Sequence, residues 1–186
     1  MNIALRNIIR RATLATVALL LSFGIAGAQI DLRISKSKIK SSLKRLDKLE
    51  LLAAQLNTAS GSTQAAADQL CQIAKQCKEL SESISHYINQ VSVLSTLQAS
   101  SEKVLQRTLL LTKLDSLSKE LASHKESISS IGSSIMSLSA SSSASNGTSS
   151  KALKSIGAKI LKIAEKEYLY QAMAVGNMIS ALGAMK

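Results

Sequence analysis

The chain contains no proline and no tryptophan, and it has only one phenylalanine, three tyrosines and two cysteines. Because proline interrupts helices, its absence is compatible with long continuous helices. The scarcity of aromatic rings argues against a nucleic-acid surface on which bases stack. No histidine-rich cluster, glycine-rich phosphate loop, nucleophile elbow or paired-carboxylate pocket can be located. We therefore expect a non-enzymatic protein that binds no cofactor, no metal and no nucleic acid.

The first 28 residues have the layout of a cleaved secretory signal. Arg6, Arg10 and Arg11 precede an apolar run over residues 12–27, and the small residues Ala26 and Ala28 stand before residue 29. This three-part order predicts cleavage after residue 28 and export to the periplasm or the extracellular space of a bacterium. A twin-arginine signal and an uncleaved membrane anchor remain alternatives.

Positive charge is concentrated at the two ends of the mature chain. Loss of the three leader arginines lowers the formal net charge from +11 to +8, and residues 29–48 and 151–186 carry most of the excess. In an exported protein this distribution favours an anionic membrane surface or an acidic protein as partner.

Two apolar stripes with alternating steps of three and four residues predict two amphipathic helices. The first stripe comprises Leu70, Ile73, Cys77, Leu80, Ile84, Tyr87, Val91 and Leu94, and the second comprises Leu110, Leu114, Leu117, Leu121, His124, Ile128, Ile131, Ile135 and Leu138. The stripes are two residues out of phase, so on one continuous helix they would lie on nearly opposite faces. They mirror each other across residues 100 and 101, which predicts a helical hairpin with its turn near 98–103 and Ser100 or Ser101 as N-cap.

Two further helices are expected outside the hairpin. One carries Ile39, Leu43, Leu46, Leu49, Ala53 and Leu56 on one face and ends in the breaker-rich segment 57–63. The other spans residues 151–186 and follows a serine-rich linker or loop at 140–150. Residues 29–139 thus hold the first helix and the hairpin. The sequence predicts an all-α fold, an elongated antiparallel four-helix bundle built around a long, coiled-coil-like hairpin.

The two cysteines are expected to be unpaired with each other. Six residues of helix separate the α-carbons of Cys71 and Cys77 by roughly 9 Å, whereas a disulfide needs less than about 7 Å. Burial of both is the simplest interpretation. An intermolecular disulfide through Cys71 and a metal site at Cys77 and His124, which face each other across the hairpin, are alternatives; a register-fixing role suits His124 better.

The last helix is the segment most suggestive of function. Its first half is a basic amphipathic helix with Lys151, Lys154, Lys159 and Lys162, and residues 168–185 contain no charge. Small residues recur there at steps of four, at Ala172, Gly176, Ser180 and Ala184. That spacing allows close helix approach, either inside the bundle or in lipid.

The expected architecture resembles accessory subunits of bacterial secretion or pilus machinery and, less closely, small helical membrane-active toxins. The first resemblance implies an interaction protein of the cell envelope that binds envelope proteins or itself through helices. The second implies a membrane-active protein, pore-forming or lipid-binding, that uses its C-terminal helix.

Overall fold

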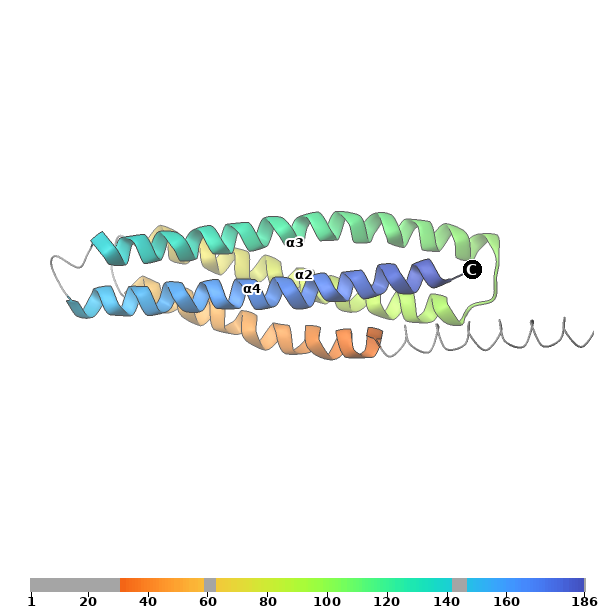
Figure 1. Cartoon of the computed structure of the whole chain (residues 1–186), viewed down its shortest axis with the longest axis horizontal. Coiled ribbons are helices and arrows are strands. Elements are labelled where there is room, and N and C mark those ends of the chain that lie inside the picture. Colours follow the sequence, from red (N-terminus) through yellow and green to blue (C-terminus); the bar gives the residue numbers. More distant parts are fainter. Residues whose placement is uncertain (1–30, 59–62, 142–146, 186) are drawn as a thin grey trace, which may run out of the picture.

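A computed structural model of the chain describes residues 31–58, 63–141 and 147–185. Within these ranges the chain forms four α-helices and no strand: a first helix over residues 31–58, α2 (Gln64–Thr96), α3 (Ser101–Ser141) and α4 (Gly147–Ala184). The helices lie side by side with alternating directions, which makes the molecule an elongated rod (Figure 1). The predicted all-α antiparallel four-helix architecture is confirmed.

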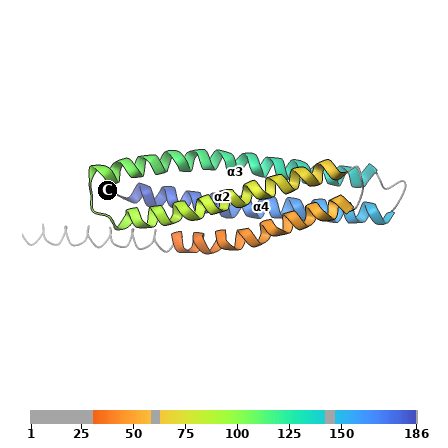
Figure 2. The same ribbon diagram turned by 180° about the vertical axis from the view of Figure 1, so that it is seen from behind.

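The two ends of the rod differ in what they contain. At one end, here called the tip, α2 turns into α3, and α4 ends beside this turn (Figures 1 and 2). The first helix also begins on this side. At the opposite, distal end the first helix leads into α2, and α3 leads into α4.

Most members of the two predicted stripes lie in the core. Four members are only half-buried: Ile73, Tyr87, His124 and Leu138. At the predicted turn the Ser100 hydroxyl oxygen accepts a hydrogen bond from the backbone N–H of Lys103 at 3.1 Å. Ser100 is therefore the N-cap of α3.

Among α2, α3 and α4, the pair α3 and α4 approaches most closely over its length. Glycines make this approach possible: a Cβ on Gly157 would lie 2.6 Å from Cγ of Met136 and 2.9 Å from the backbone oxygen of Gly132. A Cβ on Gly132 would lie 2.9 Å from the side chain of Leu161. The spacing of small residues through Gly176 also allows close helix approach, but this contact between α3 and α4 uses Gly132 and Gly157 instead.

The apolar core consists of two clusters, one in each half of the rod. The tip half comprises residues 31–42, 80–121 and 167–185, and the distal half comprises residues 46–58, 63–77, 124–141 and 147–164. A polar layer lies where the halves meet. Ser42 Oγ and Arg45 Nε both donate to the carboxylate of Glu167, and Gln171 Nε2 donates to Ser81 Oγ at 2.7 Å. Three helices are thereby joined by polar contacts at one level.

The helices extend into the serine-rich segment from both sides. α3 continues to Ser141, α4 begins at Gly147, and the Ser150 hydroxyl donates to the carbonyl of Ser139 at 2.6 Å. Residues 142–146 lie outside the described residues. The same holds for the leader, residues 1–28, and for the cleavage point that the sequence predicts.

Candidate functional site

The buried charged groups of the described residues form contacts between helices. Glu167 is the one charged side chain in these ranges that is fully buried, and both of its carboxylate oxygens are engaged by Ser42 and Arg45. Tyr170 covers the same guanidinium, with Cζ of Arg45 4.7 Å from the ring centroid. In residues 31–58, 63–141 and 147–185 no group of three or more His, Cys, Asp or Glu side chains is placed to hold a metal ion.

Sequence analysis missed this buried pair, although the sequence contains a signal for it. The buried positions of α4 continue at steps of three and four through residues 160, 164, 167, 171, 174 and 178. Glu167 and Gln171 are therefore polar members of an otherwise apolar stripe. A charge at such a position predicts a partner on a facing helix, because an unpaired buried charge is costly.

Cys77 and His124 occupy different environments. Cys77 is buried in the distal core, and burial, followed by the charges of Glu167 and Glu120, raises the pKa of its thiol to about 12. His124 is half-buried and lines a groove between α2 and α3 with Leu80 and Leu117. Its Nδ1 is buried and has no hydrogen-bond partner among the described residues. Cys71 is half-buried, and both cysteines are free, as the helix geometry predicted.

The lysines and the small residues of α4 lie in different halves of the rod. Lys151, Lys154, Lys159 and Lys162 are all exposed in the distal half. Gly176 and Ser180 are exposed in the tip half, and a Cβ on Gly176 would meet nothing within 4 Å. With a rise of about 1.5 Å per residue, roughly 21 Å separates Lys162 and Gly176, the nearest members of the two sets. They do not form one combined site.

Exposed apolar side chains are concentrated in the tip half. The large hydrophobic residues that face solvent in the described ranges are Ile34, Val93, Leu97, Val104, Leu105, Leu109, Leu169, Met173 and Ile179 in the tip half, and Leu51 in the distal half. Scattered single residues of this kind are normal on a protein surface, but a gathering of them marks an interaction site. The tip half is therefore the candidate binding end of the rod.

Two surfaces make up this end. One is the outer face of α4, with Leu169, Met173 and Ile179 beside Gly176 and Ser180. The other is the end of the α2–α3 hairpin, with Val93, Leu97, Val104, Leu105 and Leu109.

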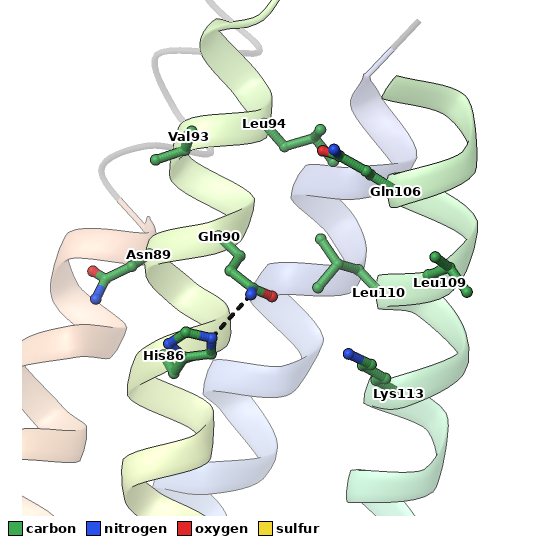
Figure 3. A pocket seen from close by; sticks show the side chains of 9 residues that line it. All are labelled: His86, Asn89, Gln90, Val93, Leu94, Gln106, Leu109, Leu110 and Lys113. Carbon is green, nitrogen blue, oxygen red and sulfur yellow. Dashed lines mark hydrogen bonds between the residues drawn. The ribbon is translucent and has the colours of Figure 1, made fainter. Parts of the chain in front are cut away.

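A groove opens between the two hairpin helices. Figure 3 shows Leu94 and Leu110 reaching into it from opposite walls, with α4 behind. Its α2 wall carries His86 and Gln90, whose side-chain nitrogens lie 2.9 Å apart, and Lys113 stands on the α3 wall. The groove is thus apolar at its base and polar at its rim.

Basic side chains surround the hairpin end without acidic partners. Residues 86–113 contain Lys103, Arg107 and Lys113 against the single acid Glu102. Lys103 Nζ donates to the carbonyl of Leu97 at 2.7 Å, and Arg107 Nε is buried without a hydrogen-bond partner in the described chain. None of the three basic groups forms an ion pair with another described residue.

No known protein family, curated protein or solved structure shows significant similarity to this chain. Inferences about its function therefore rest on its own residues. Across the described ranges, none of the helices combines the length and the apolar character that crossing a bilayer requires.

Proposed function

We propose that this chain is a non-enzymatic, exported interaction protein of the bacterial cell envelope, which docks a helix of an envelope partner against the outer face of α4. Such a role suits an accessory or structural component of a secretion, pilus or surface assembly. The observation that carries the proposal is the absence of charge from residues 168–185, on the outer as well as the inner side of the helix.

A surface helix normally has one apolar face and one polar face. The inner side of α4 is apolar as expected, with Val175, Met178 and Leu182 buried in the tip core. The outer side exposes Leu169, Met173 and Ile179, which are 53%, 42% and 40% accessible. A helix that is apolar all round is typical of a position surrounded by other helices. A fifth helix on the outer face would give α4 that environment.

The shape of this face also suits a helix. Gly176 and Ser180 lie one turn apart on the exposed side, and open space surrounds Gly176. Small side chains allow two helix axes to come closer than large ones do. Leu169 and Met173 on the preceding turns would then contact the flank of the partner helix.

The envelope location rests on the leader predicted at residues 1–28, and the non-enzymatic role rests on the chemistry of the buried groups. Glu167 and Arg45 neutralise each other, and the buried thiol of Cys77 has a raised pKa, which keeps it in its unreactive protonated form. None of these groups is available as a nucleophile or a general base.

Site-specific photo-crosslinking tests the proposal. A photoreactive amino acid replaces Ser180 on the outer face of α4 or, as a control, Ser123 on the exposed side of α3 near the middle of the rod. In cells of the source bacterium we expect one discrete adduct from position 180 and none from position 123. Absence of an adduct at 180 would contradict the proposal, whereas an adduct of twice the chain's mass would make a second copy the partner.

A second candidate function is membrane activity through release of residues 151–186 into a bilayer. The same charge-free stretch favours it, because an uncharged apolar helix can enter lipid. Release would expose Ile160, Met178 and Leu182, which are completely buried in the bundle. Release of a trapped dye from vesicles by the mature chain is the activity that this candidate predicts.

A further inference from the structure

We propose that the end of the α2–α3 hairpin is a membrane-docking tip: Leu97, Leu105 and their apolar neighbours enter the interfacial region of an anionic bilayer, while Lys103, Arg107 and Lys113 bind the lipid headgroups. This surface is separate from the outer face of α4, so the inference does not depend on the proposed partner helix.

The end of the hairpin exposes large apolar side chains to solvent. Val93, Leu97, Val104, Leu105 and Leu109 are between 47% and 61% accessible although they fall within three turns of the connection between the helices. The core does not need them, because Leu94 and Leu110 already fill the interior at this level with 2% and 6% exposure. Their exposure in water is unfavourable and points to an apolar environment in another state.

The distribution of these side chains favours lipid over a single protein face. Val104 and Leu105 are adjacent on α3 and therefore point about 100° apart, while Val93 projects from α2 and Leu97 directly follows that helix. The apolar groups thus point to more than one side of the hairpin end, and Val93 and Leu109 also line the groove between its helices. A fluid bilayer accommodates side chains on several sides, whereas a protein partner would need a matching socket.

The backbone at the turn is also prepared for a less polar environment. The carbonyl of Leu97 accepts a hydrogen bond from Lys103 Nζ, and the Leu97 N–H donates to the carbonyl of Leu94 at 3.3 Å. The Ser100 side chain and carbonyl accept from the N–H groups of Lys103 and Val104. Satisfied peptide groups lower the cost of moving the turn out of water.

Charge complementarity identifies the kind of lipid. Three basic side chains and one acidic side chain give residues 86–113 a formal net charge of +2, with no described ion pair to the basic groups. Phosphate oxygens of anionic headgroups are suitable acceptors for these basic side chains.

Co-flotation with vesicles tests the inference on the mature chain, residues 29–186, which contains every described helix. We expect binding to vesicles that contain phosphatidylglycerol and weak binding to pure phosphatidylcholine. The double variant Leu97→Glu, Leu105→Glu should bind at least about tenfold less, since charged side chains replace the inserting groups. Leu51→Glu is the control, because Leu51 is as exposed as Leu105 but lies in the distal half, and it should bind like the unmodified chain.

Two lysine variants test the electrostatic contribution to membrane binding. Lys113→Gln should lower the affinity for anionic vesicles by about fivefold, while Lys154→Gln in the distal half should leave it unchanged. Equal loss from both lysines, or equal loss from Leu51→Glu and the double leucine variant, would overturn the inference, as would failure of the unmodified chain to float with anionic vesicles.

A fluorescence measurement locates the inserted part directly. The chain has no tryptophan, so Leu97→Trp and Leu51→Trp each introduce a single reporter. With anionic vesicles the emission of the Leu97→Trp variant should shift to shorter wavelength and be quenched by brominated lipid, and that of Leu51→Trp should not change. A shift at position 51, or none at position 97, would refute insertion through the tip, and failure of crosslinking at Ser180 would not affect either result.

Discussion

At the residue scale, the buried pair of Glu167 and Arg45 is the most specific interaction between the first helix and α4. Apolar stripes fix which face of a helix is buried but tolerate sliding by one turn, because Leu and Ile can exchange places in successive layers. A buried carboxylate that must meet one guanidinium does not tolerate such sliding. The pair therefore fixes the register in which α4 packs, in the same way as a single polar core residue does in a coiled coil.

Replacement of Glu167 by alanine should strongly destabilise the bundle. It leaves the partly buried guanidinium of Arg45, whose side chain is 24% exposed, without its counter-charge. Loss of one member of a buried pair costs about 3–5 kcal/mol, and the residual exposure of Arg45 places the expected loss near the lower value. Urea unfolding followed by circular dichroism measures it. As a control, Glu165→Ala removes an exposed carboxylate two residues away and should change the unfolding free energy by less than about 0.5 kcal/mol. Equal losses of unfolding free energy in the two variants would show that the pair does not stabilise the bundle.

Cys77 should be inert in the folded protein. In a Cys71→Ser variant, a thiol reagent at pH 8 should label Cys77 only after denaturant is added, because burial excludes the reagent and raises the pKa of the thiol to about 12. The unfolded thiol ionises near its ordinary pKa of 9.0, while the folded one stays protonated. The unfolded state then binds fewer protons, so the contribution of Cys77 to stability decreases as the pH rises from about 9 towards 12. The stability advantage over a Cys77→Ala variant should shrink across that range, and rapid labelling of the native protein would contradict the burial.

At the element scale, the contrast between the two glycine sites of α4 separates packing from exposure. Gly157→Ala should destabilise the protein by about 1–3 kcal/mol, since its Cβ would lie 2.6 Å from Cγ of Met136 and 2.9 Å from a backbone oxygen. Gly176→Ala should stabilise it by about 0.5–1 kcal/mol, because no atom lies near the new methyl group and alanine favours a helix. Thermal melts of the two variants should move in opposite directions. A melting temperature raised by both substitutions would mean that α3 and α4 do not touch at Gly157.

The same contrast shows what the sequence could predict about α4 and what it could not. The stripes of α2 and α3 identified the buried faces because apolar residues there alternate with polar ones. In residues 168–185 both sides are apolar or small, so periodicity could not tell the inner side, with Met178 and Leu182, from the outer side, with Gly176 and Ser180. The close contact through Gly132 and Gly157 was also missed, because it depends on which residue of a different helix faces each glycine.

At the scale of the whole molecule, the exposed large apolar side chains of the described residues are concentrated in the tip half of the rod. This asymmetry arises from four separate segments: the start of the first helix, the end of α2, the start of α3 and the end of α4. Only the antiparallel fold brings these segments together. The sequence therefore predicted the helices and their order. The tip surface can be recognised only in the folded chain, where these four segments lie side by side.

The two possible modes of membrane contact differ in whether the rod stays closed, and a disulfide between the first helix and α4 distinguishes them. Asn177 Nδ2 donates to Ser35 Oγ at 2.9 Å, so these side chains already touch. The pair Ser35→Cys, Asn177→Cys, in a background with Cys71→Ser and Cys77→Ala, should form a bond that holds α4 in the bundle. Docking through the hairpin end needs no opening, and flotation with anionic vesicles should be the same in the oxidised and reduced forms.

Loss of flotation on oxidation would show that α4 must leave the bundle to reach the membrane. If α4 must leave the bundle to reach lipid, oxidation abolishes flotation and dithiothreitol restores it, whereas the background without the added cysteines floats under both conditions. Thiol counting confirms that the bond has formed before each flotation. Loss of binding on oxidation would transfer the membrane contact from the hairpin end to residues 151–186, because a locked rod still presents Leu97 and Leu105 to the bilayer but cannot present Met178 and Leu182.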